Sequence, residues 1–484
     1  MKKILSLALV FVLVLSLVAC GKPKREIIEL TLSTEDAEAI LAAAGITLPD
    51  ASEAVAAGTH IKWYSWHDPF HNYTENEIIN TGYFTFKEKY GCEIDWLECV
   101  WDQRYDGLAN LVLAGTSPDF FPADDIDYFP TYAIKGVFQP VNDYVDYDDP
   151  LWQGTKDFVD TYLSLAGNRY VICCETQFDD VCIFNRRVID EWGFDDPAEL
   201  YANSEWTWDE FYEMCVDFSD PDEERYALDG WYYDTNIMET SGTTSVIYNP
   251  ETGLYEANLD NPGMERAAEL IYNLKKNDCI YPVWENGWTL RNDIEGGGMK
   301  EGLCLFYIIP TWGITNPVEE VNQVWGDIEA GELMFVPMPR DPNGDGNYYV
   351  GTRIHGFLIV QGAENPEGVA LFAACERFKI MDPTVISIDK KQLIETYKWN
   401  DEMLDMYDHC MELSRSPYTV LTFGYGIGNR LYDLAIENTM NLGRHADART
   451  WAQVKEANEE AIIFYVDELN KEVAEYIAQL EAEK

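Results

Sequence analysis

The stretch that decides the fold begins Tyr170-Val171-Ile172-Cys173-Cys174, an apolar run that predicts a buried strand. A polar bend over residues 175–180 separates it from a second apolar run, Val181-Cys182-Ile183-Phe184. Residues 185–193 then read as a short helix that ends at Trp192-Gly193. Because two strands joined by an irregular polar bend can carry a chain from one lobe to another, we expect a crossing here.

The next segment, Trp206-Thr207-Trp208-Asp209-Glu210-Phe211, predicts the start of another helix. Thr207 is placed to cap the helix, because a threonine hydroxyl accepts a hydrogen bond from the first-turn amides. Asp209 and Glu210 fall in the first turn, where negative charge interacts favourably with the helix dipole.

Length and composition indicate a folded protein of two or more lobes. The chain has 484 residues, of which 47% are hydrophobic and 14% aromatic. Acidic residues outnumber basic ones 86 to 34, which gives a formal charge of -52. A field of that sign repels nucleic acid and anionic lipid headgroups, so we expect no nucleic-acid partner. Solubility at a cell surface is sufficient to explain the charge.

The N-terminus predicts export. Lys2 and Lys3 precede an apolar run over residues 4–18, which is too short to span a bilayer and has the length of a signal-peptide core. The run ends in Leu17-Val18-Ala19-Cys20-Gly21, which resembles the lipobox of bacterial lipoproteins. That resemblance implies diacylation of the Cys20 thiol, cleavage just before it, and a lipid-anchored protein on the extracytoplasmic face of the cell membrane. A chance cysteine after an ordinary secretory signal is the alternative.

Ten cysteines follow Cys20. Their even number permits disulfides in an exported protein, but most of them sit in apolar strand-like or helix-like runs rather than in short loops. We therefore expect mostly buried free thiols. No Cys-x-x-Cys pair occurs, which argues against a thiolate zinc site.

Residues 20–59 are expected to form a tether or a small insertion that packs on the body. Ser33 and Asp36 resemble a capping signal for a helix over residues 37–44, and Gly45 is expected to stop it. From His60 to Phe121, strand-like and helix-like patterns alternate, with Gly91 and Gly115 as helix ends. This alternation predicts parallel βαβ units and an α/β fold.

Four further motifs, taken with the 170–211 segment, carry a family resemblance. They are residues 113–121 (Leu-Ala-Gly-Thr-Ser-Pro-Asp-Phe-Phe), residues 136–144, the Gly302 to Trp312 spacing, and Gly362-Ala363-Glu364-Asn365-Pro366-Glu367-Gly368. In this order they resemble the family 1 extracellular solute-binding proteins of carbohydrate ABC importers. Cys304, Leu305 and Pro310 depart from the family pattern. In the last motif, Asn365 is expected to cap a helix whose first residue is Pro366.

The resemblance implies a two-lobed, type II periplasmic-binding-protein-like fold, in which two α/β lobes joined by a hinge bind ligand in the cleft between them. We expect a signal peptide at residues 1–19, a tether at 20–59, lobe 1 at 60–175 and 313–382, and lobe 2 at 176–312 and 383–484. The return to lobe 1 is expected through residues 333–339 and a strand over residues 356–360. A long amphipathic helix over residues 451–480 is expected to end the chain.

A sugar site requires aromatic rings for the C–H face of the sugar and planar polar groups for its hydroxyls. Loops that combine both give the expected ligand-binding residues, and the resemblance favours Trp66 and Trp312 among them because the family's corresponding loops line the cleft. Buried core positions are the alternative for each ring. The expected ligand-binding residues are Trp66, His67, Asp68, Asp124, Trp231, Tyr232, Trp312 and Tyr425.

Two motifs raise the question of a metal. His67 and His71 are four residues apart, but Pro69 prevents a helix that would bring both rings to one face. Asp341, Asn343 and Asp345 match the first half of an EF-hand loop, whereas Thr352 at its last position lacks the bidentate carboxylate. A plain turn between strands is the alternative to calcium there, and we expect no metal and no cofactor.

The sequence contains no Gly-x-Ser-x-Gly elbow, no Walker loop and no His-Glu-x-x-His. We therefore expect a monomeric binding protein rather than an enzyme, with an oligosaccharide as ligand, separate permease subunits as partners and the membrane reached through the lipid anchor. A surface glycoside hydrolase, or a binder of peptide or another polar solute, is the alternative.

Overall fold

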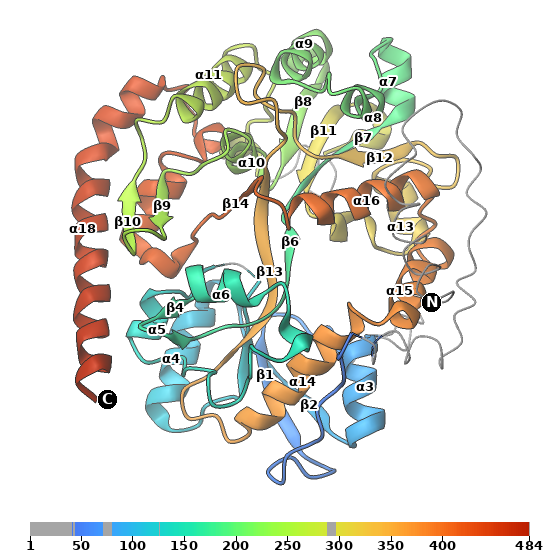
Figure 1. The fold of residues 1–484 in the computed structure, drawn as a ribbon. Coiled ribbons are helices and arrows are strands. Elements are labelled where there is room, and N and C mark those ends of the chain that lie inside the picture. Colours follow the sequence, from blue (N-terminus) through green and yellow to red (C-terminus); the bar gives the residue numbers. More distant parts are fainter. Residues whose placement is uncertain (1–40, 42–43, 71–79, 125, 288–296, 484) are drawn as a thin grey trace, which may run out of the picture.

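Two separate β-sheets form the centres of two α/β lobes, one above the other in Figure 1. The structure is a computed structural model, and it describes residues 41, 44–70, 80–124, 126–287 and 297–483. The α/β class and the division into two lobes are therefore confirmed.

The first sheet has the order β14-β13-β3-β1-β2, with β6 also paired to β13. β1 pairs in parallel with β2 and β3, as expected for βαβ units, whereas β13 runs antiparallel to β3 and β6. Its strands are β1 (His60–Ser65), β2 (Glu93–Glu98), β3 (Phe120–Pro122), β6 (Ile172–Phe178), β13 (Val350–Ile359) and β14 (Thr419–Val420). The helices of this lobe are α3 (Thr81–Tyr90), α4 (Arg104–Ala114), α5 (Thr131–Ile134), α6 (Lys156–Tyr162) and α14 (Pro366–Lys379).

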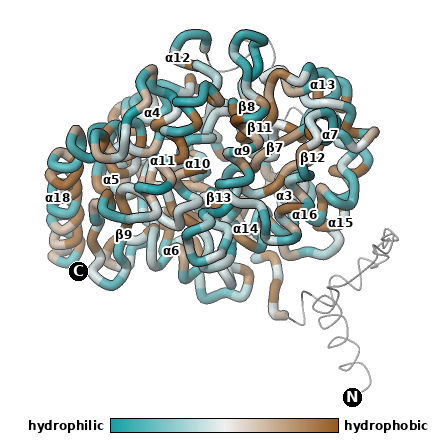
Figure 2. The backbone as a smooth tube through the Cα atoms, turned by 90° about the horizontal axis from the view of Figure 1, so that it is seen from above, coloured by the Kyte–Doolittle hydropathy of each residue, from teal (hydrophilic) through white to brown (hydrophobic). Residues whose placement is uncertain are grey.

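The second sheet has the order β12-β7-β11-β8. Apolar residues are concentrated on these interior strands, as the hydropathy colouring of Figure 2 shows. Its strands are β7 (Val181–Asn185), β8 (Tyr226–Gly230), β11 (Cys304–Ile309) and β12 (Leu333–Val336). The helices of this lobe are α7 (Arg186–Trp192), α8 (Pro197–Ala202), α9 (Trp208–Phe218), α10 (Tyr233–Glu239), α11 (Pro262–Lys276), α12 (Val283–Asn286), α13 (Val318–Val324) and α16 (Asp401–Leu413). α15 (Pro383–Glu395) links α14 of the first lobe to α16 (Figure 1).

Local signals set most element boundaries as predicted. The Asn185 side chain accepts hydrogen bonds from the first-turn amides of α7, and Gly193 ends that helix with a φ of 70°. The Thr207 hydroxyl accepts from the Glu210 amide at the start of α9. Trp206, between them, is fully buried, and its indole donates to the Pro337 carbonyl.

Three expectations are wrong. The polar bend is shorter than residues 175–180, because β6 continues through Phe178 and only Asp179 and Asp180 separate it from β7. β12, expected on the return to lobe 1, pairs with β7 in the second sheet, where its apolar side chains are buried on both faces. Asn365 does not cap α14, because its side-chain amide donates to the His60 carbonyl instead.

The segments that cross between the lobes lie side by side at Gly351. The Asp179 amide, just past β6, donates to the Gly351 carbonyl at 3.0 Å. β14 pairs in parallel with β13 at Val350 and Gly351. β6 and β13 run through the middle of the molecule between the two lobes (Figure 1). Rotation of one lobe against the other must therefore bend this hydrogen-bonded ribbon.

The C-terminal helix α18 (Trp451–Glu483) runs alongside both lobes (Figure 1). On the second lobe it packs against the hairpin of β9 (Val246–Asn249) and β10 (Leu254–Ala257), where Asn470 exchanges two hydrogen bonds with the Tyr255 backbone. Near its end, Tyr476 reaches Tyr170 beside the first sheet.

The described part of the expected tether packs on the first lobe. Ile46 and Val55 are buried, and the Tyr90 hydroxyl donates to the Pro49 carbonyl at 2.7 Å. Gly45 has a φ of 73°, the left-handed conformation expected of a helix stop. Most of the helix expected over residues 37–44, and the lipobox with Cys20, lie outside the described residues.

Candidate functional site

Three side chains gather just beyond the carboxyl ends of β1 and β2 in the first lobe. Trp66 is half-buried, and its ring meets Trp101 edge to face at 4.4 Å between centroids. The Arg104 guanidinium lies 3.7 Å from the centre of the Trp101 ring, which is a close cation–π contact. The site therefore presents aromatic rings and a fixed cation together.

An ion pair holds Arg104 in place. Arg104 and Asp127 are both buried, and the guanidinium donates to the Asp127 carboxylate. Burial alone would lower the pKa of Arg104, but Tyr105 and Asp127 outweigh it and raise the pKa. The other Asp127 oxygen accepts from the Tyr425 amide at 3.0 Å. Asp127 thus brings Tyr425, distant in sequence, to the same group.

The polar residues predicted next to Trp66 lie in the same region. The His67 ring is 5.2 Å from Trp66, and its Nδ1 is 3.1 Å from the Ser65 hydroxyl. Burial lowers the pKa of His67, and the nearby Asp124 carboxylate acts in the opposite direction. The Asp68 carboxylate accepts from the Phe70 amide, which closes the predicted turn.

In the second lobe, the predicted aromatic residues come together after β8 and β11. The rings of Trp231 and Trp312 meet edge to face at 5.4 Å, and Tyr232 lies 6.4 Å from Trp231. Trp312 is 42% exposed and Tyr232 is 37% exposed. Their exposure is what a binding surface requires and a core position does not.

A second ion pair, whose carboxylate is buried, supports this group. The Arg444 guanidinium donates to Asp234 and, at 2.6 Å, to the Trp231 carbonyl. Asp234 is completely buried; burial raises its pKa, and Arg444 partly offsets the effect. One Asp234 oxygen and the Trp231 indole nitrogen are buried without a hydrogen-bond partner. Each lobe therefore carries an aromatic group backed by an arginine that is paired with a buried carboxylate.

The sequence missed both of these pairs. Trp101, Arg104 and Asp127 in the first lobe, and Asp234 and Arg444 in the second, belong to no motif. Only 34 basic residues occur beside 86 acidic ones, so a buried arginine is unusual in this chain. That scarcity is the one signal that could have drawn attention to them.

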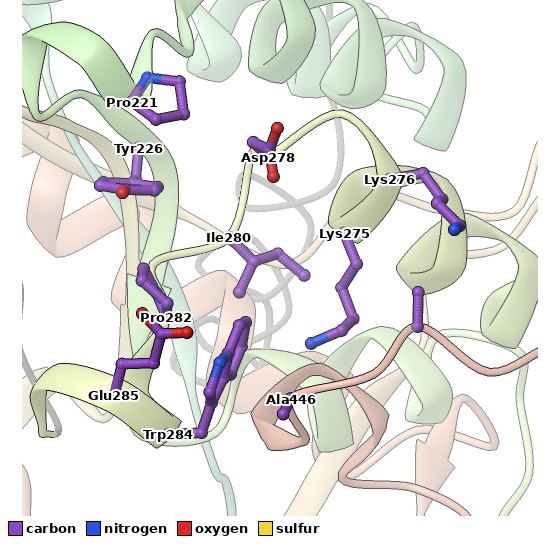
Figure 3. Close-up of a pocket in the computed structure, with 11 residues that line it drawn as sticks. Pro221, Tyr226, Lys275, Lys276, Asp278, Ile280, Pro282, Trp284, Glu285 and Ala446 are labelled. Carbon is purple, nitrogen blue, oxygen red and sulfur yellow. The ribbon is translucent and has the colours of Figure 1, made fainter.

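Two cavities lie away from the two aromatic groups. One, of about 430 Å³, opens on the second lobe between α11, α12 and β8 (Figure 3). The other, of about 370 Å³, lies where the crossing strand β6 meets the ends of α14 and α16, and Leu41 and Ile46 help to line it. None of the eight residues predicted to bind ligand lines either cavity.

The carboxylates of the calcium candidate already have partners. Asp341 is buried and forms a two-nitrogen ion pair with Arg266, while its other oxygen accepts from the Asn343 amide. Asp345 accepts from the Asn347 amide and the Tyr349 hydroxyl. Across the described ranges, no three His, Cys, Asp or Glu side chains are arranged to hold a metal ion. The turn itself therefore accounts for these residues, and His71 lies outside the described part.

The ten cysteines after Cys20 are free thiols, and nine of them are buried, as the sequence predicts. Cys99, at the end of β2, is the partly exposed one. None of the helices in the described residues is both long and hydrophobic enough to traverse a bilayer.

Solved structures with the same architecture confirm the type II fold. Their sequence identities to this chain are low, so the similarity concerns the fold alone. The ABC substrate-binding protein Lmo0181 from Listeria monocytogenes, solved with cycloalternan, has a TM-score of 0.58 at 15% identity; 86% of this chain and 98% of that one are covered. The galacto-N-biose-/lacto-N-biose I-binding protein from Bifidobacterium longum has a TM-score of 0.59 at 11% identity, with 86% and 98% covered. The GacH receptor of Streptomyces glaucescens has a TM-score of 0.58 at 12% identity, with 84% and 98% covered.

The sequence itself identifies the family. No curated protein matches the chain. Residues 70–375, more than half of its 484 residues, match the family described as "Bacterial extracellular solute-binding protein". The match spans the crossing segment, the second sheet and the first sheet apart from β1 and β14. Of the residues of the two aromatic groups, it leaves out Trp66, His67, Asp68, Tyr425 and Arg444. The chain belongs to the bacterial extracellular solute-binding protein family.

Proposed function

We propose that this protein is the substrate-binding component of a carbohydrate ABC importer, which captures an oligosaccharide between its lobes and delivers it to separate permease subunits. The observation that carries the proposal is the pair of exposed aromatic groups, one on each lobe, each backed by an arginine that is paired with a buried carboxylate. Rings for the sugar face and fixed polar groups for hydroxyls are what such a ligand requires.

Seven of the eight predicted residues belong to the two aromatic groups, and Asp68 closes the turn beside the first of them. Trp66, His67, Asp124 and Tyr425 belong to the first-lobe group with Trp101 and Arg104, and Trp231, Tyr232 and Trp312 belong to the second-lobe group with Arg444. A ligand held by both groups would draw the lobes together. The solved relatives support the sugar class, because cycloalternan and lacto-N-biose are the ligands named for two of them.

We further propose that residues 1–19 are a signal peptide and that lipid on Cys20 anchors the protein outside the cytoplasm. The basic start, the apolar run and the Leu17-Val18-Ala19-Cys20 ending support this. We assign residues 60–175 and 337–382 to the first lobe and residues 176–336 and 383–484 to the second, except that β14 and Tyr425 reach back to the first lobe. The pairing of β12 with β7 supports the revised boundary.

The test is a thermal-shift screen of the purified protein over neutral mono- and oligosaccharides, peptides and other polar solutes. A glycan that raises the melting temperature and is recovered unchanged supports the proposal. Turnover of the glycan would instead support a surface hydrolase. Stabilisation by peptides alone would replace the carbohydrate assignment with a peptide one.

A further inference from the structure

The larger of the two cavities lies on the second lobe, outside both aromatic groups. It has a volume of about 430 Å³, within the range of small-molecule sites. Figure 3 shows Trp284, Ile280 and Lys275 around a common space, with Tyr226 and Glu285 on the left and Asp278 above Ile280. The cavity is therefore walled by segments from β8, the end of α11 and α12.

Its walls combine aromatic rings with an apolar floor. Trp284 and Tyr226 are half-buried rather than sealed in the core, while Ile280 is buried beneath them. Tyr226 is fixed by an edge-to-face contact with Tyr281 at 5.5 Å. Partly exposed rings over an apolar floor offer a surface for the C–H face of a ligand.

Lys275 contacts the face of the Trp284 ring. The Lys275 ammonium lies 3.8 Å from the centre of the Trp284 ring. The same ammonium donates to the backbone carbonyls of Gly443, at 2.8 Å, and His445. Burial lowers the pKa of Lys275 to about 8, and Asp234 acts in the opposite direction. A ring restrained by such a contact loses less freedom when a ligand covers it.

The charges around the cavity balance, although the chain as a whole carries -52. Lys275 and Lys276 contribute two positive charges, and Asp278 and Glu285 contribute two negative charges. A lining of this kind has no net preference for an anion or a cation, but it offers donors and acceptors for hydroxyl groups. The ligand that fits is polar, neutral and apolar on one face.

We propose that this cavity is a second binding site for a neutral saccharide, separate in position from the site between the lobes. In this site, the sugar ring lies against Trp284 and Tyr226, and its hydroxyls meet Asp278, Glu285 and Lys276. No contact with the aromatic groups on the lobes is required.

The two sites share one loop. Gly443 and His445 hold Lys275 on the cavity side, while Arg444 between them holds Asp234 and the Trp231 carbonyl on the other side. A ligand in the cavity therefore lies on the far side of the loop that supports the second-lobe aromatic group. Occupation of the second site can therefore change the position of the residues that support the first.

The test uses full-length mature protein labelled with fluorotryptophan and observed by fluorine NMR. The Trp284 resonance is assigned as the signal that disappears in Trp284→Phe. Glucose, maltose, maltotriose and lacto-N-biose are then titrated into the Trp312→Ala variant up to about 10 mM, a range that detects millimolar binding. We expect a saturable shift of the Trp284 signal with at least one of them. Tyr226→Ala, which removes the other ring of the site, should abolish that shift, whereas Phe464→Ala, which removes an exposed ring elsewhere, should not.

Charged analogues test the ligand class. Glucosamine and glucuronate, which keep the sugar ring and add a charge, should shift the Trp284 signal less than glucose does at equal concentration, because the lining is charge-balanced. A Trp284 signal unmoved by all four neutral saccharides, or moved more strongly by a charged analogue, overturns the proposal. Either result would leave the proposed function intact. That function is tested by the effect of Trp312→Ala on glycan affinity, in protein whose Trp284 is unaltered.

Discussion

The phenol oxygens of Tyr170 and Tyr476 lie 2.8 Å apart, which joins the C-terminal helix α18 to the first lobe. The same helix is fixed to the second lobe by the two hydrogen bonds between Asn470 and the Tyr255 backbone. α18 therefore braces the lobes at a distance from the ribbon of crossing strands at Gly351. Lobe separation must either break the tyrosine contact or carry the end of the helix with the first lobe.

Tyr476→Phe should loosen this brace. The variant loses one hydrogen bond, which is worth about 1 kcal/mol of unfolding free energy, and keeps the ring packing. Small-angle scattering without ligand should give a larger radius of gyration than for the original protein, and a saturating glycan should bring both proteins to the same smaller radius. Tyr465→Phe on the same helix is the control. Identical radii without ligand would show that the contact does not restrain the lobes.

Glu239 should make stability depend on pH. It is buried, Thr422 donates to one of its oxygens, and the other has no partner and lies against Gly351 in the crossing ribbon. Burial, assisted by the negative charge of Asp179, raises the pKa of Glu239 from 4.5 to about 8. Between these values the folded protein keeps the proton that the unfolded chain has lost. The free energy of unfolding therefore falls as pH rises through this window, by up to about 1.4 kcal/mol per pH unit, and levels off above it.

Glu239→Gln should flatten that slope, as measured by urea unfolding at several pH values. Some slope should remain, because burial also raises the pKa of Asp180 well above its usual range, with Asp179 acting in the same direction. The exposed Glu251→Gln serves as the control and should leave the slope unchanged. A slope in Glu239→Gln equal to that of the original protein would mean that Glu239 is ionised in the folded state.

Local chemistry explains what the sequence could predict. Gly91, Gly115 and Gly193 were expected as helix ends, and all three adopt the left-handed backbone that terminates a helix, with φ of 68°, 69° and 70°. Such signals need no knowledge of the rest of the chain. The choice of strand partner, in contrast, depends on the rest of the chain. Leu333–Val336 has the pattern of a buried strand in either sheet, and only packing places it beside β7.

The same limit applies to the site. Trp66, Trp231 and Trp312 were predicted because each follows a strand in a loop that also holds polar residues, and the structure groups them by lobe. Arg104 and Arg444 belong to no sequence pattern of this kind. Their roles come from carboxylates 23 and 210 positions away in the sequence, and a single sequence does not reveal pairs at such separations.

Cys20→Ala should release the protein from membranes. The anchor proposed here is the pair of acyl chains on the Cys20 thiol, and without the thiol neither chain can be attached. Fractionation of cells that express each form should find the original protein with the membranes and the variant outside that fraction. Cys99→Ala, which removes the partly exposed thiol at the end of β2, should remain with the membranes. A Cys20→Ala protein that still sediments with membranes would contradict the anchor.

Trp312→Ala should separate ligand binding from stability. The ring is 42% exposed and touches Trp231 edge to face, so its removal leaves no closed cavity and should lower the melting temperature little. A ring that covers a sugar face acts as a hot spot, and its loss should weaken glycan affinity by about 2 kcal/mol, roughly thirtyfold. Trp206→Ala is the matched control, because Trp206 is fully buried and its truncation should cost about 3–5 kcal/mol of unfolding free energy. Calorimetric titration and thermal melts on both variants make the comparison. A large fall in melting temperature for Trp312→Ala, with affinity kept by the protein that remains folded, would assign Trp312 to the core and move the sugar site elsewhere.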